Sequence, residues 1–468
     1  MAKGNPILMN GIRHECITPV SALDNEIGIR SLADYESKAR YVPDGKPGGY
    51  RAIQHVLNNM SPEQVIDEVK ASGLRGKGGA GFPTGLKWSF VPKDHPGPKY
   101  LAINGDEGEP GTFKDRYIME DCPHRLIEGA MIAMHAIGAE QTYCYIRGEF
   151  YDSLRLLDDA VKECYAKGYL GDNVFGTGKR MHFQVHTGAG AYICGEETSM
   201  LSSIEGSRGH PKMKPPFPAI EGVFRKPTII NNVESIACAP AIIDAGAGWF
   251  TARGTEKSPG IKIVSVSGCV RNPGWWEIEY GTPIGVIVNE LAGGLLPGRK
   301  LKGLIPGGSS CPVIKGEAAY DVPFDYEGCV AGGSMLGSAA MIVLDDSIDM
   351  VGVMRNFSKF YAHESCGKCT PCREGTRWML QIHQRILDGG GTMEDLDLLI
   401  DIINGIEAKS FCPLGDAAAW PVRSAVERFP EDYIAWIEKS SRFNALKENG
   451  NGSASPAGSE EAAEVEAS

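Results

Sequence analysis

Short apolar runs alternate with longer segments of helical length through the first half of the chain, and glycine-rich loops separate them. The apolar runs have the length and composition of buried strands. The predicted strands are residues 100–103, 141–146 and 182–186, and the predicted helices are residues 126–137 and 153–166. Because strands that alternate with helices build parallel sheets covered by helices, this half is predicted to be an α/β domain with a mostly parallel sheet.

The pattern changes near residue 246. Residues 261–268 alternate as a strand, an Asn-Pro-Gly turn follows, residues 275–279 form a second strand and residues 283–291 a short helix. Further short strands are predicted up to about residue 344. This mixture indicates a small α+β domain.

From about residue 347 the chain is predicted to be almost all helix. Thr392 is placed to cap a helix whose apolar residues form one stripe. These residues are Leu396, Leu399, Ile402, Ile403 and Ile406. We therefore expect this part to be a helical domain.

Both ends of the chain differ from this body. The first 50 residues are polar and rich in Gly and Pro, which predicts an extended arm. The last residues are Ser, Gly, Ala and Glu without an aromatic, which predicts disorder. The predicted division is an arm at 1–50, an α/β domain at 51–245, an α+β domain at 246–345, a helical domain at 346–446 and an acidic tail at 447–468.

A chain of 468 residues is long for one domain and can bury a substantial core. Its 59 acidic residues exceed the 47 basic ones, and the net charge of −12 argues against nucleic acid as the main ligand. The sequence has no run of about 18 apolar residues, and the N-terminal residues lack an apolar signal core. We therefore expect a cytoplasmic protein without a membrane span.

Four of the 13 cysteines form a pattern, and the other nine are scattered singly, as small buried residues are in a reducing cytosol. Cys366, Cys369 and Cys372 form a C-x2-C-x2-C run whose thiolates can converge on one iron–sulfur cubane. Cys412, which Pro413 follows, is the natural fourth ligand. A structural zinc site is the alternative, although zinc more often uses two separated C-x2-C pairs.

A glycine-rich loop, residues 76–81, contains the pattern G-x-G-x-x-G. A capping box at residues 61–64 predicts that a helix precedes it, whereas the dinucleotide-binding fingerprint follows a strand. The glycines still let the backbone approach a flat ring or a phosphate, and Arg75, Lys77 and Lys87 add positive charge. A mobile surface loop is the alternative.

An acidic loop directly follows the strand predicted at residues 100–103. It contains Asp106, Glu107 and Glu109. Ligands of open α/β sheets bind beyond the carboxyl ends of the strands. Three carboxylates at this position suit ribityl or ribose hydroxyls, amines or a cation, and a solvated acidic loop is the alternative.

A further loop, residues 188–198, leads into a helix predicted at residues 198–204, whose first backbone N–H groups can hold a phosphate. Lys212, Lys214 and Phe217 lie on the Pro-rich strip that follows. An adenine can stack there, although a Pro-rich linker has the same composition.

Taken together, five segments resemble the NADH-oxidising flavoprotein subunit of respiratory complex I. They are GLRGKGGAGFPTGLKW at 73–88, NGDEGEPG at 104–111, AYICGEET at 191–198, NNVE at 231–234 and ESCGKCTPCREG at 364–375. Cys412 also lies where this family has its fourth cluster ligand. The resemblance covers about residues 50–445.

The resemblance implies a flavin-binding α/β domain, a ubiquitin-like (SLBB-type) α+β domain and a helical bundle that carries a [4Fe-4S] cluster. It implies that FMN is bound by Gly76, Gly78, Lys87, Asn104, Asp106, Glu107, Tyr192, Gly195, Glu196, Asn231 and Asn232. It implies that NADH is bound by Gly79, Phe82, Phe90, Glu109, Glu197, Lys214 and Phe217, with Glu109 near the nicotinamide. The cluster ligands are Cys366, Cys369, Cys372 and Cys412.

The activity implied is that of an NADH:quinone oxidoreductase subunit, in which hydride passes from NADH to FMN and single electrons pass to the cluster. No side chain need act as acid or base, because the cofactors carry the chemistry. Glu197 at the adenosine ribose would disfavour the extra phosphate of NADPH. The implied partners are a thioredoxin-like [2Fe-2S] subunit and a larger iron–sulfur subunit of the peripheral arm, which hold the chain at the inner face of the cell membrane.

Two other functions fit parts of this pattern. Similar modules are the NAD-reducing half of soluble hydrogenases and formate dehydrogenases, which often carry extra iron–sulfur domains. The sequence has no further cysteine cluster before residue 50 or after Cys412, which favours complex I. The second is a zinc-stapled scaffold that only docks partners, and iron analysis with a flavin spectrum distinguishes it.

Overall fold

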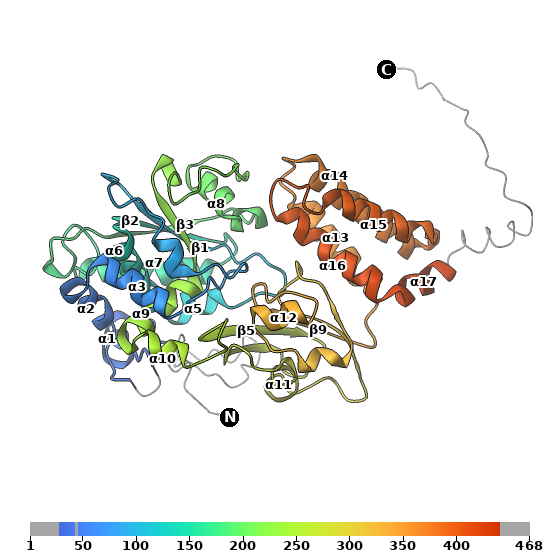
Figure 1. Ribbon diagram of the computed structural model, residues 1–468, viewed down its shortest axis with the longest axis horizontal. Coiled ribbons are helices and arrows are strands. Elements are labelled where there is room, and N and C mark those ends of the chain that lie inside the picture. Colours follow the sequence, from blue (N-terminus) through green and yellow to red (C-terminus); the bar gives the residue numbers. More distant parts are fainter. Residues whose placement is uncertain (1–27, 43–44, 440–468) are drawn as a thin grey trace, which may run out of the picture.

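The computed structural model describes residues 28–42 and 45–439 and contains three structural units (Figure 1). We call them the α/β unit, the second-sheet unit, which begins with the strand at Ile261, and the helical unit, which begins with the helix at Met350. The predicted tail at 447–468 and the first 27 residues of the predicted arm lie outside the described residues.

The α/β unit is built on a parallel sheet with the strand order β3-β2-β1-β4. Its strands are β1 (Tyr100–Gly105), β2 (Gln141–Ile146), β3 (His182–Thr187) and β4 (Thr228–Asn232). The prediction of a mostly parallel sheet is confirmed. Because β1 and β4 pair with Asn104 opposite Asn232, the carboxyl ends of these two strands lie side by side.

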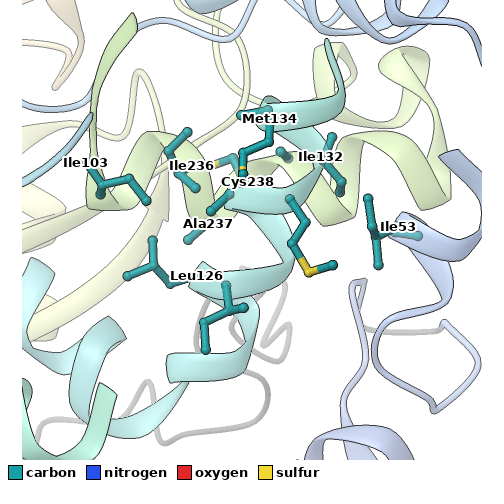
Figure 2. Packing of buried hydrophobic residues seen from close by; sticks show 14 of the residues in the cluster. Ile53, Ile103, Leu126, Ile132, Met134, Ile236, Ala237 and Cys238 are labelled. Atoms are coloured by element: carbon teal, nitrogen blue, oxygen red, sulfur yellow. The ribbon is translucent and has the colours of Figure 1, made fainter. Parts of the chain in front are cut away.

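Two buried helices, α6 (Pro123–Ile137) and α9 (Val233–Ala245), pack against each other and against β1. The helices approach closely at Gly129, where a Cβ would lie 2.2 Å from the backbone oxygen of Ile236. Figure 2 shows the side chains that form this core, among them Leu126, Ile132 and Met134 of α6 and Ile236, Ala237 and Cys238 of α9. The helix predicted at residues 126–137 is confirmed, and it begins three residues earlier.

The remaining helices of this unit pack around that core, except α8, whose buried residues Met200, Leu201 and Ile204 belong to a second hydrophobic cluster. They are α1 (Leu32–Lys38), α2 (Arg51–Asn59), α3 (Pro62–Ala71), α4 (Thr84–Trp88), α5 (Asp115–Asp121), α7 (Tyr151–Ala166), α8 (Glu197–Ile204) and α10 (Ala247–Thr251). The predicted capping box opens α3, because Gln64 N–H donates to Ser61 Oγ at 3.3 Å and Ser61 N–H donates to Gln64 Oε1 at 2.7 Å. The helix before the glycine-rich loop is thereby confirmed.

The second-sheet unit has the strand order β6-β5-β9-β7-β8, in which only β5 and β9 pair in parallel. Its elements are β5 (Ile261–Gly268), β6 (Gly274–Glu279), α11 (Ile284–Val286), β7 (Leu301–Ile305), β8 (Ile314–Lys315), α12 (Tyr326–Ala331) and β9 (Ala340–Asp345). One wider helical turn, Ile287–Leu291, continues α11. The mixed sheet with short helices agrees with the α+β prediction.

The helical unit consists of α13 (Met350–Glu364), α14 (Thr370–Arg385), α15 (Glu394–Ile406), α16 (Leu414–Arg428) and α17 (Pro430–Glu438). The predicted apolar stripe of α15 faces the core, where Leu399, Ile403 and Ile406 are buried. Thr392 does not cap the helix, because Met393 directly precedes its first residue and no side-chain hydrogen bond caps it. Thr392 N–H instead donates to the Asp395 carboxylate at 3.0 Å. Across residues 28–42 and 45–439, we find no helix with the length and apolar character that crossing a membrane requires.

The scattered cysteines behave as small core residues. Cys269 is partly exposed. The other described members of this group are buried, namely Cys122, Cys144, Cys164, Cys194, Cys238, Cys311 and Cys329. Cys16 lies outside the described residues.

A buried carboxylate ties the N-terminal segment to α6, and this corrects the prediction of an extended arm for its described part, residues 28–42 and 45–50. Residues 32–38 form α1, and Tyr35, Tyr41 and Tyr50 are fully buried. Glu128 of α6 accepts hydrogen bonds from the hydroxyls of Tyr35, at 2.6 Å, and Tyr41, at 2.7 Å. It also accepts from the backbone N–H groups of Tyr50 and Ile53, each at 3.1 Å. The polar composition of the arm hid these tyrosine anchors.

We expect Glu128→Gln to lower the free energy of unfolding by about 2–4 kcal/mol, because an amide turns a donor toward groups that are themselves donors. Denaturant unfolding followed by circular dichroism gives the value. Glu140→Gln is the matched control: Glu140 is exposed and lies 3.6 Å from Arg180. The free energy of unfolding of this control should change by less than about 0.5 kcal/mol. Equal losses in the two variants would contradict this role of Glu128.

Candidate functional site

A cavity of about 900 Å³ lies along β4 and the end of β1, between the glycine-rich loop, the start of α8 and the Pro-rich strip. This volume is in the range of cofactor and nucleotide sites, about 300–1,000 Å³. The position agrees with the rule that open α/β sheets bind ligands beyond the carboxyl ends of their strands.

Most of the residues predicted to bind FMN or NADH line this one cavity. From the FMN set these are Gly76, Gly78, Lys87, Asn104, Gly195, Glu196, Asn231 and Asn232. From the NADH set they are Gly79, Phe82, Phe90, Glu197, Lys214 and Phe217. The predicted residues that are not in the lining are Asp106, Glu107, Glu109 and Tyr192. The fold thus assembles segments that lie up to 156 residues apart in the sequence (Gly76 to Asn232), while the ligand roles of the residues stay predictions.

The glycine-rich loop forms one wall of the cavity. Gly76 N–H donates to the backbone oxygen of Phe82 at 2.8 Å, which folds the loop back on itself. Gly79 has a φ of +149°, and a Cβ at this position would meet nothing within 4 Å. Its α-carbon therefore faces open space, and a flat ring can lie close to the backbone there.

Only one of the three cations predicted to charge this loop reaches the cavity, namely Lys87. Arg75 turns away and pairs with Glu327 at 2.6 Å. Lys77 is fully buried and lies 4.0 Å from Glu234. Of the three cations predicted to add positive charge near the loop, Arg75 and Lys77 are thus paired with carboxylates outside the lining of the cavity.

A buried ionic cluster supports the far side of the cavity. The Glu234 carboxylate accepts a hydrogen bond from Lys262 and lies 3.2 Å from Lys114 and 4.0 Å from Lys77. Burial alone would raise the pKa of Glu234, but the three ammonium groups lower it to about 2. Burial lowers the pKa of Lys262 to about 7 against the attraction of Glu234. Lys114 Nζ also lies 3.4 Å from Oδ1 of Asn232, which lines the cavity.

Asp106 lies directly behind the cavity wall at Gly195. A Cβ on Gly195 would lie 3.4 Å from the backbone oxygen of Asp106 and 3.6 Å from its Oδ2. This Oδ2 atom is buried and, in the part of the chain that the structure describes, has no hydrogen-bond partner. Burial raises the pKa of the carboxyl to about 7, although Arg147 opposes the shift. A buried acceptor of this kind suits a hydroxyl donor from a bound ligand.

The other two acids of this loop are bound by the protein itself. Glu107 accepts hydrogen bonds from three backbone N–H groups at the start of α5, at 2.9 to 3.2 Å. Glu109 accepts from Tyr192 Oη at 2.6 Å and from the backbone N–H of Ser310 at 2.7 Å. Since Ser310 belongs to the second-sheet unit, Glu109 joins two units of the molecule. Sequence reasoning could not separate these capping and bridging carboxylates from a ligand-binding one.

Glu196 occupies the helix start that was predicted to hold a phosphate. Its carboxylate accepts hydrogen bonds from Thr198 N–H at 3.0 Å and Ser199 N–H at 2.9 Å. The helix α8 is therefore capped by its own chain. This prediction of a phosphate site is wrong for the described structure, although Glu196 itself lines the cavity.

Glu197 lies between two lysines at the edge of the cavity. It lies 3.6 Å from Lys87 and accepts a hydrogen bond from Lys214 of the Pro-rich strip. Burial raises the pKa of Glu197, but the two lysines outweigh burial and hold it below its usual value. Glu197 is thus a fixed negative charge at the mouth of the cavity.

Three exposed aromatic side chains surround the same mouth. The exposed fractions of Phe82, Phe90 and Phe217 are 43%, 48% and 58%. The ring centroids of Phe82 and Phe90 lie 6.1 Å apart. Exposed aromatic side chains gathered around a cavity are typical of a site that stacks a flat ring.

The four predicted cluster cysteines come together in the helical unit. Cys372 lies in the first turn of α14, and Cys412 lies two residues before α16. Burial raises the pKa of Cys412 to about 12, and Cys372 and Cys366 raise it too. Burial likewise raises the pKa of Cys372 to about 11, with Cys369 and Cys366 adding to the shift. Phe411, the residue before Cys412, donates a hydrogen bond from its N–H to Cys369 Sγ at 3.4 Å, so the fold brings Cys412 to the C-x2-C-x2-C run.

Two polar groups lie close to the sulfur atoms of this site. Phe411 N–H donates to Cys369 Sγ at 3.4 Å, and Ser365 Oγ lies 3.2 Å from Cys372 Sγ. Hydrogen bonds to sulfur are a means of tuning a cluster. Among the described residues, no group of three His, Cys, Asp or Glu side chains that could hold a metal ion is found.

The cavity and the cysteine site share a wall. Pro413, which directly follows Cys412, lines the cavity. Tyr192 N–H also donates to Glu364 at 3.0 Å, two residues before Cys366. Sequence reasoning did not place Pro413 at the cavity; its only signal was the Cys-Pro pair. It also missed the lining residues 228–230 of β4, which directly precede the predicted Asn231.

Two family models match the chain. The Nuo51 FMN-binding domain matches residues 69–241, and the NADH-ubiquinone oxidoreductase-F iron-sulfur binding region matches residues 352–436. An NADH-quinone oxidoreductase subunit of Rhizobium meliloti (strain 1021) is 50% identical over 405 residues, which cover 85% of this chain and 96% of that relative. The corresponding NADH-quinone oxidoreductase subunit of Mycobacterium tuberculosis (strain ATCC 25618 / H37Rv) is 50% identical over 415 residues, which cover 87% and 91%.

A solved structure of an NAD+-reducing [NiFe]-hydrogenase in the H2-reduced state is also similar. It superposes with a TM-score of 0.75 at 33% identity over 83% of this chain. The match spans 65% of the length of the hydrogenase chain.

The carboxyl of Asp106 should make stability depend on pH. Because its folded pKa, about 7, lies above the usual 3.8, the stability contributed by its bound proton is complete below about pH 4 and is lost as the pH rises through 7. When the pH is raised from about 5 to about 8, we expect the free energy of unfolding of Asp106→Asn to increase by roughly 1–3 kcal/mol relative to that of the wild type. Denaturant unfolding of both proteins at the two pH values measures this. Arg147, Glu149 and Glu364 are present in both proteins, so a pH-independent difference would contradict the prediction.

Proposed function

The chain belongs to the family of NADH-quinone oxidoreductase subunits that carry the Nuo51 FMN-binding domain, and we propose that it is the NADH-oxidising, electron-input subunit of a respiratory complex I. NADH is oxidised at the cavity with FMN as cofactor, and the electrons leave through a [4Fe-4S] cluster toward quinone. The observation that carries this proposal is the shared wall: Pro413 lines the nucleotide-sized cavity directly beside Cys412. A two-electron site and a one-electron site are thereby adjacent.

The cavity fits FMN in its volume, in its glycine wall and in the unpaired buried oxygen of Asp106. The residues that would hold FMN are the lining residues of the predicted set together with Asp106, Glu107 and Tyr192 behind the wall. Asp106 would accept a ribityl hydroxyl, which would satisfy its Oδ2. Glu107 would act from behind by holding the start of α5.

NADH would enter at the aromatic mouth. Phe82, Phe90 and Phe217 would stack the adenine, with Lys214 beside them, and Gly79 would leave room for the nicotinamide. Glu197 would face the adenosine ribose. Glu109 and Tyr192 form a hydrogen-bonded pair at 2.6 Å, so their proposed places beside the nicotinamide and the flavin adjoin each other.

Bound FMN would supply the chemistry of this site, since a flavin accepts hydride from NADH and gives up electrons one at a time. The side chains of this chain bind and orient the two ring systems, and no general acid or base is required of them. When two ring systems react, a protein accelerates the reaction mainly by holding the rings in contact and in the reactive orientation. The buried ionic cluster behind Asn232 and the backbone hydrogen bonds of the glycine-rich loop keep this alignment rigid.

The four cysteines would hold the [4Fe-4S] cluster as thiolates. The matching iron-sulfur family model and the proximity of Cys412 to the run support this over a structural zinc. The polar groups of Ser365 and Phe411 near the sulfurs would tune its potential.

The finer organisation is also part of the proposal. A ubiquitin-like domain at residues 246–345, which contains the second-sheet unit, would follow an α/β domain at 51–245 and precede a cluster domain at 346–446. A thioredoxin-like [2Fe-2S] subunit and a larger iron–sulfur subunit would receive the electrons. These partners would hold the chain at the inner, cytoplasmic face of the membrane.

An NAD-reducing hydrogenase subunit is the second candidate, which the TM-score of 0.75 favours. Its identity of 33% is lower than the 50% of the NADH-quinone oxidoreductase relatives, and these relatives are matched along nearly their full length. Purification of the native complex decides between the two, since only a hydrogenase would contain nickel.

We expect Cys369→Ser to lose the [4Fe-4S] cluster while NADH-to-ferricyanide activity remains, because the dye takes electrons directly from the flavin. Low-temperature EPR of the NADH-reduced protein measures the cluster. Cys269→Ser, at a lone and partly exposed cysteine, should keep both signals. An intact cluster signal in Cys369→Ser would refute the ligand assignment.

We expect Glu197→Gln to weaken the preference for NADH over NADPH roughly ten-fold, because it removes a negative charge that repels the additional phosphate. The ratio of kcat/KM for the two nucleotides measures the preference. Glu221→Gln, at an exposed residue just beyond the Pro-rich strip, should leave this ratio unchanged. The idea fails if both variants keep the selectivity of the wild type.

A further inference from the structure

The glycine-rich loop is held in place by the second-sheet unit. Tyr326, the first residue of α12, donates a hydrogen bond from Oη to the backbone oxygen of Gly76 at 2.7 Å. Its ring lies against the other end of the loop, since a Cβ on Gly81 would be 2.5 Å from the ring. Both ends of the loop therefore contact one side chain that comes from a helix of the second-sheet unit.

Arg75 covers the same ring. Its guanidinium lies 3.9 Å from the centroid of Tyr326, and its Nε donates to the backbone oxygen of Gly81 at 2.8 Å. Glu327, next to Tyr326, binds Arg75 at 2.6 Å and accepts from Ser258 Oγ at 2.6 Å. The arginine is thereby fixed on the tyrosine rather than left free to move with the loop.

A second tyrosine continues this support. Tyr280 lies next to Tyr326, with ring centroids 5.8 Å apart. Lys77, inside the loop, donates to the backbone oxygen of Ile261 and has its ammonium 4.8 Å from the ring centroid of Tyr280. The two charged side chains of the loop region thus both end on the second-sheet unit, on the side away from the cavity.

This arrangement has a consequence for the cavity. Glycine has more backbone freedom to lose than any other residue, so a wall that is rich in glycine is costly to order. Gly79 has open space around its α-carbon, and Gly81 has a φ of +66°. External contacts at Gly76 and Gly81 limit the conformations that this stretch can adopt. A wall ordered in advance loses less entropy when a ligand binds.

We propose that Tyr326 is a positioning residue that pre-orders the glycine-rich loop for the flavin, and that the second-sheet unit serves as the support for this wall. Tyr326 contacts the loop from behind and does not line the cavity. The inference rests on the proposed function, because it takes FMN as the ligand of the wall.

Tyr326→Phe tests the proposal in the full-length chain purified with its flavin. The variant keeps the ring and removes only the hydrogen bond to Gly76. We expect hydrogen–deuterium exchange of residues 73–82 to become faster and the dissociation constant of FMN, measured by fluorescence quenching, to rise about two- to ten-fold. The melting temperature at saturating FMN should remain close to that of the wild type, because a single neutral hydrogen bond is lost.

Tyr320→Phe is the matched control, since Tyr320 belongs to the same unit and packs against its core near Gly285. In Tyr320→Phe, neither the hydrogen–deuterium exchange of residues 73–82 nor the dissociation constant of FMN should change. Arg75→Lys is a second variant that loses the Nε bond to Gly81, and it should shift both quantities in the same direction as Tyr326→Phe. It serves as the test if Tyr326→Phe does not fold.

Unchanged loop exchange and unchanged FMN affinity in Tyr326→Phe would overturn the positioning role, and so would a lowered melting temperature with unchanged affinity. A wild-type chain that is folded but cannot bind FMN would overturn the proposed function, and this inference with it. Measuring whether the folded wild-type chain binds FMN therefore distinguishes the two failures.

Discussion

The arrangement of the molecule depends on one desolvated carboxylate, that of Glu234. It is fully buried and surrounded by the ammonium groups of Lys77, Lys114 and Lys262. These lysines come from the glycine-rich loop, from the residue before α5 and from β5, so one charge connects three segments that are distant in sequence. A buried ion pair adds little net stability, but removing one partner leaves a charge that costs several kcal/mol, about 3–5. The cluster therefore restricts how the loop and the two sheets can be arranged.

A second junction connects the cavity to the cysteine site. Glu109 of the α/β unit is bound by Ser310 of the second-sheet unit, and Ser309 Oγ lies 2.9 Å from Tyr361 Oη of the helical unit. Pro413 belongs to the wall of the cavity, and the adjacent Cys412 belongs to the predicted cluster ligands. Electron transfer between two centres depends on their separation staying constant. Buried hydrogen bonds between all three units provide that constancy, since each would leave an unpaired polar group if the units moved apart.

Local features of the site could be predicted from residues alone. Strand positions followed from short apolar runs and the α3 capping box from Ser61 and Gln64, while the cluster ligands proposed from cysteine spacing stay a prediction. The directions in which side chains point could not be predicted from the residues alone. Lys77 and Lys87 are both lysines near the same loop, yet one is buried beside Glu234 and the other lines the cavity. Glu107 and Asp106 are adjacent acids, yet one binds backbone N–H groups and the other keeps an unpaired oxygen.

The sequence by itself determined the local chemistry: glycines that permit a close backbone approach, carboxylates after a strand, and three thiols with cluster spacing. These properties depend on covalent structure and on neighbours a few residues away. Only the tertiary structure decided that Pro413 would close the cavity next to Cys412, that Tyr326 would support the glycine-rich loop, and that Asp106 would remain unpaired. Such outcomes depend on which segments meet in space, because burial removes water and each polar group must then find a partner among whatever residues the fold brings to it.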